Sequence, residues 1–299
     1  MHSLAAWVAH LADRLVSFST IKSYLTGLKS AHIDIGFVIF DDSFFHPMLQ
    51  RVVAGIRKLR GEANTHEREP LTRGLLLRVL PLLDTSTQYG ATLHAAFCLA
   101  FAGFLRIGEF TYSKNDLSDP EFDRWHITRG SVTLHKDHME LSLPSSKTDP
   151  FRRGILLTIA AADDDACPVR SLRHLLERFP TDSLSAPLFF TSSREYFTRQ
   201  FVIDTLRALL ARLGIDGHFS GHSFRRGAAT WARIAGLSEE EIMLLGRWKS
   251  DSWRLYVKTH PSYIIAVSRR HQRRLPSASL ATASPGAPLG ALGSGLGSA

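Results

Sequence analysis

Three short segments of alternating apolar and polar residues interrupt a chain whose apolar residues otherwise recur at helical spacing. The segments 131–135, 140–143 and 153–159 alternate with the period of a β-strand. Turn-forming residues separate them at Asp137 and from Pro144 to Asp149. Short strands that follow one another across such turns pair antiparallel. The sequence therefore predicts a mainly α protein with a small antiparallel sheet, an α+β fold class.

Helical periodicity covers most of the remaining chain, and polar stretches divide it. The stretch 62–70 ends in Pro70 and is typical of a linker between a small helical domain, residues 1–61, and a larger domain, residues 71–276. Because the first helix begins almost at residue 1, the sequence leaves open whether the smaller domain is truncated. Residues 277–299 contain only small residues, Leu, Pro and Thr, so we expect a disordered tail. Helices are expected over 4–15, 19–35 (with Ser19 as N-cap), 46–60, 72–83, 87–101, 169–179, 194–213, 223–235, 238–245, 251–258 and 262–271.

The net charge of +8 and the isoelectric point of about 9.8 favour a polyanionic partner. Lys and Arg that meet phosphates release condensed counterions, so double-stranded DNA suits such a surface, although a merely soluble basic surface remains the alternative. Cys98 and Cys167 are the two cysteines, which excludes a disulfide framework and a Cys/His metal spacing and favours a reducing compartment. No apolar run is long enough to span a membrane, so we expect no membrane partner.

Several residues with phosphate chemistry lie far apart in the sequence. Arg106 and Glu109 follow an apolar helical pattern, and Lys147 occupies the turn between the second and third predicted strands. His222 and Arg225 are three residues apart and share one face of a helix that begins there. Taken singly, each residue has an ordinary structural explanation, such as an exposed helix end or a solubilising turn.

Two aromatic residues complete the set. Trp248 and Tyr256 lie in the segment L-G-R-W-K-S-D-S-W-R-L-Y, where each would by default belong to a hydrophobic core. The order Arg, Lys, His-x-x-Arg, Trp, Tyr nevertheless resembles the catalytic set of the tyrosine recombinases, the phage integrase family that includes Cre and the Xer proteins. The form G-R-W-x-S-D is most similar to that of eukaryotic mobile-element recombinases of the Crypton kind. The N-terminal T-I-K-S-Y-L-T-G-L-K-S-A-H resembles a SAM-like core-binding, DNA-binding domain.

This resemblance implies a DNA integrase or recombinase that works without metal or other cofactors. Arg106 and Arg225 would hold the non-bridging oxygens of a phosphodiester bidentately, and Tyr256 would attack its phosphorus. Tyrosine has a reference pKa of about 10, so His222 would accept or return its proton within the cationic cluster. Lys147 would protonate the leaving 5′ oxygen. The covalent phosphotyrosine conserves the energy of the cut bond, so rejoining needs no ATP.

Two further roles follow from the same resemblance. Trp248 would donate its indole N–H to a phosphate oxygen while its ring packs between helices. Glu109 would orient an arginine rather than react. The separation of Trp248 and Tyr256 is eight residues (256 minus 248), one fewer than the resemblance leads us to expect. Tyr263 is the alternative nucleophile, but it lies seven residues further along and follows Pro261.

Other nucleic-acid enzymes fit the sequence less well. Metal-dependent nucleases need converging carboxylates, whereas the acidic run Asp163 to Asp165 precedes Pro168 in a predicted loop, and no phosphate-binding G-x-x-x-x-G-K-[ST] loop occurs. A type IB topoisomerase-like enzyme and a catalytically silent DNA-binding protein remain as alternatives. For a recombinase we expect a tetramer on paired DNA sites, in the nucleus if the host is eukaryotic and otherwise in the cytoplasm.

Overall fold

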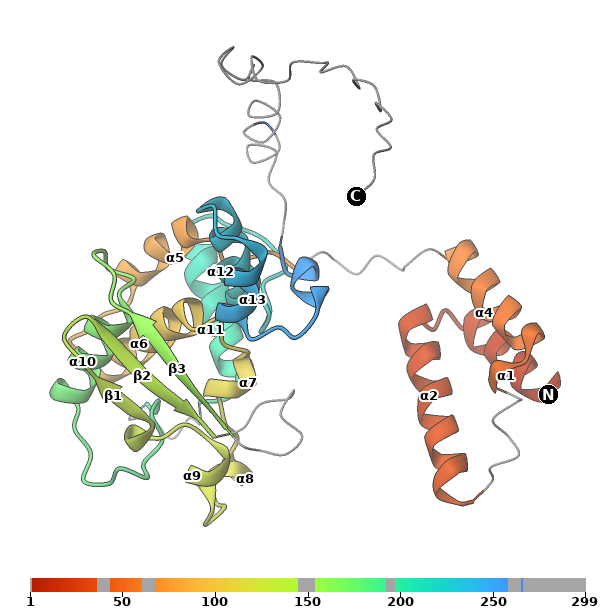
Figure 1. Cartoon of the computed structure of the whole chain (residues 1–299), viewed down its shortest axis with the longest axis horizontal. Coiled ribbons are helices and arrows are strands. Elements are labelled where there is room, and N and C mark those ends of the chain that lie inside the picture. Colours follow the sequence, from red (N-terminus) through yellow and green to blue (C-terminus); the bar gives the residue numbers. More distant parts are fainter. Residues whose placement is uncertain are drawn as a thin grey trace, which may run out of the picture. The chain divides into compact units, whose positions relative to one another are not determined.

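The computed structural model describes residues 2–36, 44–60, 68–144, 154–191, 197–257 and residue 265. The N-terminal part contains the helices α1 (His2–Asp13), α2 (Phe18–Asp34) and α4 (Pro47–Arg60), which pack against one another in pairs (Figure 1). Their apolar faces meet in a hydrophobic cluster of their own, in which Val8 and Ile21 are fully buried. Burial of such side chains stabilises the three-helix group by roughly 1.5–3 kcal/mol each.

The three predicted N-terminal helices are present with small shifts of their ends. The hydroxyl of Ser17, rather than that of Ser19, caps α2, because it accepts the backbone N–H of Thr20 at 3.2 Å. Ser19 lies inside the helix, and its Oγ is 3.0 Å from that of Ser17. The predicted N-cap was therefore wrong by two residues.

The larger part combines helices with one sheet (Figure 1). The strands β1 (Val132–Leu134), β2 (His138–Leu143) and β3 (Ile155–Ala160) pair antiparallel in the order β1-β2-β3, with Val132 opposite Leu141 and Leu141 opposite Leu157. The predicted fold class is thereby confirmed. The helices are α5 (Arg73–Val79), η2 (Leu80–Leu82), α6 (Gln88–Ala102), α7 (Ile107–Phe110), α8 (Lys114–Leu117), α9 (Phe122–Trp125), η3 (Arg129–Ser131), α10 (Pro168–Arg178), α11 (Arg199–Arg212), α12 (Ser223–Ile234), α13 (Glu239–Gly246) and η4 (Asp251–Leu255).

Helix α6 forms the centre of this part. It is apolar on nearly all sides, and Leu93, Phe97 and Leu99 are fully buried in it. It packs against α10 on one side and α12 on another. The sheet turns Met139 and Leu141 toward the same core. Because α6 is held from several sides, the turn that follows it and the start of α12 occupy fixed positions.

Some sequence-based expectations differ from the structure. The short helices α7, α8 and α9 were not predicted, because a single helical turn leaves no periodicity in the sequence. The predicted helix 251–258 is the 3₁₀ helix η4, and residue 258 lies outside the described residues. Most of the linker and of the last predicted helix, and the whole tail 277–299, also lie outside them, so the domain boundaries stay predictions. Among the described residues no helix combines the length and hydropathy needed to cross a membrane.

Candidate active site

The buried arginine of helix α12 is the centre of the candidate site. Arg225 follows the N-cap residue His222 by three positions and has a fully buried side chain. Its Nη1 donates to the carbonyl of Phe104 at 2.5 Å, and its Nη2 donates to the carbonyl of Gly246. Its Nε has no hydrogen-bond partner in the part of the chain that the structure describes. The arginine thus links α12 to the turn after α6 and to the end of α13.

The turn after α6 places Arg106. Phe104 adopts a positive φ of 50°, which non-glycine residues rarely do, and its carbonyl thereby faces Arg225. Arg106 is the N-cap residue of α7. Glu109, three residues on, accepts the backbone N–H of Arg106 at 2.9 Å and its Nη1 at 2.9 Å. The Glu109 carboxylate therefore fixes both the backbone and the guanidinium of Arg106.

A third arginine approaches the same carboxylate. Arg247 ends α13 with a φ of 57°, a left-handed position where glycine is usual. Its Nη2 lies 2.8 Å from Oε2 of Glu109, and its Nη1 donates to the carbonyl of Gly103 at 2.9 Å. Side-chain exposure is 4% for Glu109 and 9% for Arg247, so this ion pair is largely removed from water. Phe104 and Arg247 are thus two of the three described non-glycine residues with a positive φ, and the third, Leu15, follows α1.

Two aromatic rings cover the arginine. The guanidinium carbon of Arg225 lies 4.0 Å from the ring centroid of Trp248 and 5.6 Å from that of Tyr256. The Trp248 ring packs edge-on against Phe104 and closely against Gly246, where a Cβ would overlap it. The absence of a side chain at Gly246 therefore leaves room for the indole of Trp248 to fold back onto the end of α13.

Tyr256 is held next to these rings. It follows η4, and its ring centroid lies 5.4 Å from that of Trp248 and 5.9 Å from that of His222. Arg226 of α12 donates to the carbonyl of Leu255 at 2.8 Å, which fastens η4 to α12. The phenol therefore lies beside the guanidinium and the imidazole rather than in a separate core.

Electrostatics within the cluster favour a neutral histidine and an anionic ligand. Partial burial, followed by the charges of Arg68 and Arg225, lowers the pKa of His222 below its ordinary value. Burial, followed by the charges of Arg106 and Arg247, lowers the pKa of Arg225 to about 9, so its guanidinium stays protonated at neutral pH. Positive charge exceeds negative charge in the cluster, because Glu109 is a single carboxylate among these arginines. A bound phosphate would supply the missing negative charge.

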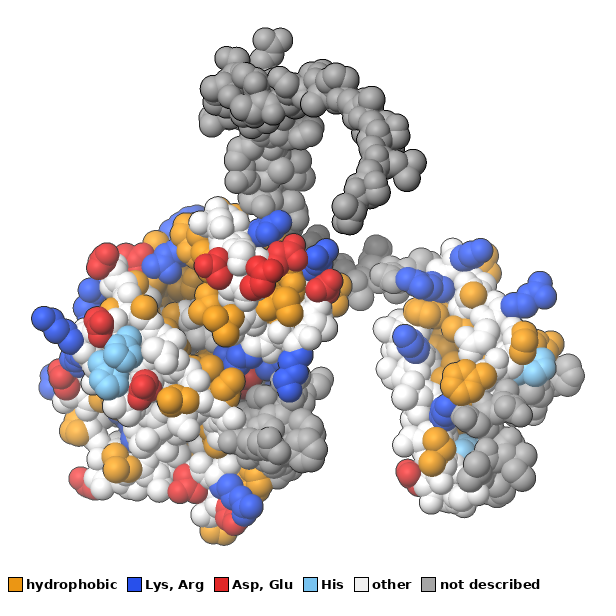
Figure 2. Space-filling model, viewed as in Figure 1, with side chains coloured by type: hydrophobic (Ala, Val, Ile, Leu, Met, Phe, Trp, Pro, Cys, Tyr) orange, Lys and Arg blue, Asp and Glu red, His pale blue; other side chains and the backbone are white. Residues whose placement is uncertain are grey.

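The structure brings together most of the residues that the sequence singled out. Arg106, His222, Arg225, Trp248 and Tyr256 form one cluster with Glu109, through the contacts and electrostatic interactions given above. Figure 2 shows Lys and Arg side chains gathered at the surface between α13 and α7. Lys147 and the alternative nucleophile Tyr263 lie outside the described residues. The catalytic roles of these residues stay predictions.

Arg247 is the member of the cluster that sequence reasoning missed. It lies nine residues before Tyr256 (256 minus 247), which is the spacing that the resemblance led us to expect for Trp248. Counting back from the tyrosine would have found it. At that spacing the sequence has an arginine instead of an aromatic residue, and the structure brings this arginine into the cluster through its ion pair with Glu109.

Metal ligands were not expected from the cysteine and histidine spacing, and the arginine cluster itself contains one acidic side chain, Glu109. Elsewhere in the described residues, His135, His138 and Glu140 bring ligand atoms within 4.8 Å of one another. These residues belong to the β1–β2 hairpin and are considered separately below.

Comparisons with known proteins agree with the geometry. No protein-family model matches the chain. The sequence is 25% identical over 257 residues, 83% of this chain and 70% of the relative, to the integrase/recombinase xerD homolog of Selenomonas ruminantium. The fold is similar to that of the XerA recombinase, with a TM-score of 0.51, 16% identity and coverage of 91% of this chain and 98% of that one. It is also similar to the Tn1549 transposon integrase in complex with transposon right end DNA, with a TM-score of 0.55, 15% identity and coverage of 90% and 84%. The chain thus has the fold of tyrosine recombinases and integrases.

Proposed function

We propose that this chain is a site-specific DNA recombinase that cleaves and rejoins DNA through a covalent 3′-phosphotyrosine on Tyr256, without metal or ATP. One observation carries the proposal: residues from the turn after α6, the start of α12 and the segment after α13 assemble a cationic cluster around a tyrosine. A hydrophobic core would not need buried guanidiniums there, because each carries a desolvation cost. A phosphodiester bound beside the phenol explains both features.

The cluster provides a side chain for each atom whose bonding or charge changes in the proposed reaction. Arg106 and Arg225 would hold the non-bridging oxygens and stabilise the charge that develops on them. The phenol oxygen of Tyr256 would form a bond to phosphorus while the bond to the 5′ oxygen breaks. The phenol proton passes to His222, and the 5′ oxygen takes a proton from Lys147. Rejoining reverses these steps with a 5′ hydroxyl from another strand.

The state of His222 supports its part in this scheme. Its lowered pKa leaves the imidazole neutral at neutral pH, so it can accept the proton of the phenol. Its ring centroid lies 5.9 Å from that of Tyr256, close enough for a direct or water-mediated transfer after small rotations. Trp248 would donate its indole N–H to the phosphate while its ring continues to cover Arg225.

The partner in this proposal is double-stranded DNA, consistent with the net charge of +8. The xerD homolog and the Tn1549 integrase are a recombinase and a transposon integrase by name, and we infer an equivalent role in DNA integration for this chain. Exchange between two duplexes cuts each of their strands, and each protomer offers one Tyr256. We therefore propose a tetramer on paired DNA sites.

Two finer assignments belong to the same proposal. The G-R-W-K-S-D segment at 246–251 supports a place among Crypton-like mobile-element recombinases. Because the substrate is genomic DNA, the protein would act in the nucleus of a eukaryotic host, or otherwise in the cytoplasm. Imaging of the tagged chain in its host tests the second assignment.

The decisive test is capture of the covalent intermediate. The full chain is incubated with nicked suicide duplexes made from the flanks of its own gene, and products are separated by denaturing electrophoresis. A protease-sensitive protein–DNA adduct is expected in the unmutated chain and in Tyr89→Phe, which changes an exposed tyrosine outside the cluster. Tight DNA binding without any adduct would instead identify a catalytically silent DNA-binding protein. Relaxation of supercoiled DNA by a monomer would identify a topoisomerase-like enzyme.

A further inference from the structure

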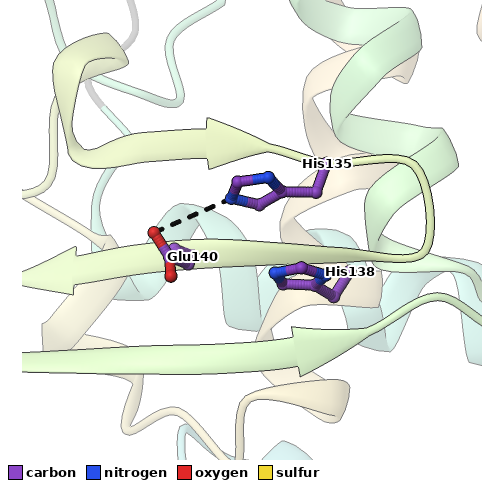
Figure 3. Close-up of side chains that lie close together, drawn as sticks. All are labelled: His135, His138 and Glu140. Carbon is purple, nitrogen blue, oxygen red and sulfur yellow. Dashed lines mark ion pairs between the residues drawn. The ribbon is translucent and has the colours of Figure 1, made fainter.

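The turn between β1 and β2 carries a histidine pair and a glutamate that no step of the proposed reaction uses. His135 follows β1, whereas His138 and Glu140 are two residues apart in β2 and therefore lie on one face of it (Figure 3). Met139 and Leu141, on the opposite face of β2, are fully buried in the core. The three side chains thus project together from a strand whose position is fixed.

The hairpin that holds these residues is rigid. The backbone N–H of His135 donates to the carbonyl of His138 at 2.9 Å, which closes a turn of two residues. Glu140 pairs with Thr133 on one side and Thr158 on the other, so its strand has neighbours along both edges. Side chains on such a hairpin are preorganised relative to one another, as ligands of a metal ion must be.

The ligand atoms face one another across the hairpin. Nε2 of His135 lies 3.8 Å from a carboxylate oxygen of Glu140, and the rings of His135 and His138 are stacked with centroids 4.2 Å apart. One ligand atom from each of the three residues lies within 4.8 Å of the others. Ligands around a tetrahedral zinc ion with bonds of about 2.0–2.1 Å are separated by about 3.4 Å. Side-chain rotations that move the ligand atoms by about 1 Å would therefore bring them to the separation found around zinc.

Two details of the histidine side chains suit a metal ion at the hairpin. Nε2 of His135 is buried and has no hydrogen-bond partner among the described residues, which is unusual for a polar atom. Nδ1 of His138 lies 2.7 Å from a carboxylate oxygen of Asp137, and a carboxylate can only accept. In the neutral imidazole, the proton of His138 therefore sits on Nδ1, and Nε2 keeps the lone pair that a metal ion requires.

We propose that His135, His138 and Glu140 form a binding site for a divalent transition-metal ion, with zinc as the best match. Two imidazoles and one carboxylate suit zinc rather than magnesium, and a water molecule would complete the four ligands. Asp137 orients His138 from outside the ligand set. The side chains of His135, His138 and Glu140 are 40%, 33% and 36% exposed, so the cluster lies at the protein surface although Nε2 of His135 itself is buried.

The position of the site assigns it a structural role. The metal ligands lie at the turn where β2 begins, whereas Leu143 ends the strand and precedes the segment that contains Lys147. A bound ion would join the ends of β1 and β2 and stabilise the sheet, since any ligand that binds only the folded state does so. The inference does not depend on the proposed recombinase activity.

Metal binding to the chelator-treated full chain provides the test. Isothermal titration with Zn²⁺ should show about one equivalent at this site and a raised melting temperature, whereas Mg²⁺ should give neither. The double variant His135→Ala, His138→Ala should lose that equivalent and the rise in melting temperature. His10→Ala, which changes an exposed histidine of α1, is the matched control and should retain both. Equal zinc stoichiometry and affinity in the double variant and the unmutated chain would overturn the proposal.

Shape-preserving variants cover the case in which the double variant fails to fold. Glu140→Gln keeps the volume of a ligand and Asp137→Asn keeps that of the residue that orients His138. Asp137→Asn should weaken zinc binding by about 10-fold or more, the range for loss of a group that orients a ligand, and Glu140→Gln should weaken it at least as much because Glu140 is itself a ligand. Unchanged zinc affinity in both folded variants would exclude this site.

Discussion

The N-terminal three-helix group and the arginine cluster use the same residue types in opposite ways. In the described part of α1, α2 and α4 the buried residues are apolar, and the basic side chains lie toward solvent. In the larger part, Arg225 is fully buried and its neighbours Glu109 and Arg247 are nearly so. An exposed charge costs little, whereas a buried guanidinium costs desolvation free energy that a core of leucines would avoid. The difference is consistent with the phosphate site proposed above.

The cation–π contacts of the two regions also differ in their exposure to water. Nζ of Lys29 lies 4.0 Å from the ring centroid of Phe45, which is 63% exposed. The guanidinium carbon of Arg225 lies at the same distance from the ring centroid of Trp248, which is 7% exposed. Water screens the first pair but not the second. The same cation–ring distance of 4.0 Å thus belongs to an exposed contact in the N-terminal group and to a buried contact in the arginine cluster.

The largest expected effect concerns the nucleophile. Tyr256→Phe removes one oxygen and keeps the ring that packs beside Trp248, so folding and DNA affinity should hardly change. Strand cleavage should fall below detection, because no other group in the cluster can form the covalent bond. Single-turnover cleavage of a suicide substrate measures this. Persistence of an adduct in the variant would transfer the role to Tyr263 or another residue.

Loss of the buried arginine should come next. Arg225→Ala removes positive charge beside the proposed phosphate and leaves the carbonyls of Phe104 and Gly246 without their donor. We expect the cleavage rate to fall by about 10²–10³-fold, with a smaller loss of DNA affinity. Arg225→Lys keeps the charge without the bidentate geometry, so its cleavage rate should lie between those of the unmutated chain and Arg225→Ala. Cleavage rates unaffected by both substitutions would separate the buried charge from catalysis.

Glu109 should have an intermediate effect, because it acts through the arginines. Glu109→Gln retains hydrogen-bonding atoms but removes the charge that Arg106 and Arg247 share. The cleavage rate should fall by about 10-fold, in line with the loss of one charge-assisted hydrogen bond, while KM for DNA changes less. Glu121→Gln, in the exposed ion pair with Arg124, is the matched control and should cleave normally. A similar loss in both variants would indicate a general effect of surface charge.

The pH dependence of cleavage tests His222. Its folded-state pKa is lowered, so the neutral form that accepts a proton prevails above the ordinary value of 6.5 and is lost only as pH falls through the lower folded value. The cleavage rate should therefore stay level near neutral pH and decline in acid. His222→Asn should be slower throughout and lack this acidic decline. An identical acidic limb in the variant would assign the titration to another group.

The smallest expected effect belongs to the N-terminal group. Arg57→Ala removes an exposed positive charge from α4, so DNA affinity should decrease modestly and the slope of log affinity against log salt should fall by about one. The cleavage rate at saturating DNA should not change. Titrations at several salt concentrations measure the slope. A large loss of cleavage at saturation would mean that Arg57 contributes to the chemical step as well as to DNA affinity.

The sequence by itself determined the fold class and much of the candidate site. Strand alternation and helical periodicity are local properties, so they predicted the sheet of 132–160 and most of the long helices. Arg106, His222, Arg225, Trp248 and Tyr256 were predicted as a set because their order in the sequence resembles the catalytic set of the tyrosine recombinases. Local patterns did not predict that Ser17 caps α2 in place of Ser19, nor that the helix predicted over 251–258 is a 3₁₀ helix.

Only the tertiary structure decided how these residues meet. The place of Arg247 depends on a left-handed turn at the end of α13 and on a carboxylate from α7, 138 residues earlier in the chain. The proposed metal site at the β1–β2 turn depends on strand register, because the register brings Glu140 beside His135. Residue types set what chemistry is possible, because they fix charge and proton affinity. Whether that chemistry is assembled depends on contacts between distant segments, which local patterns do not encode.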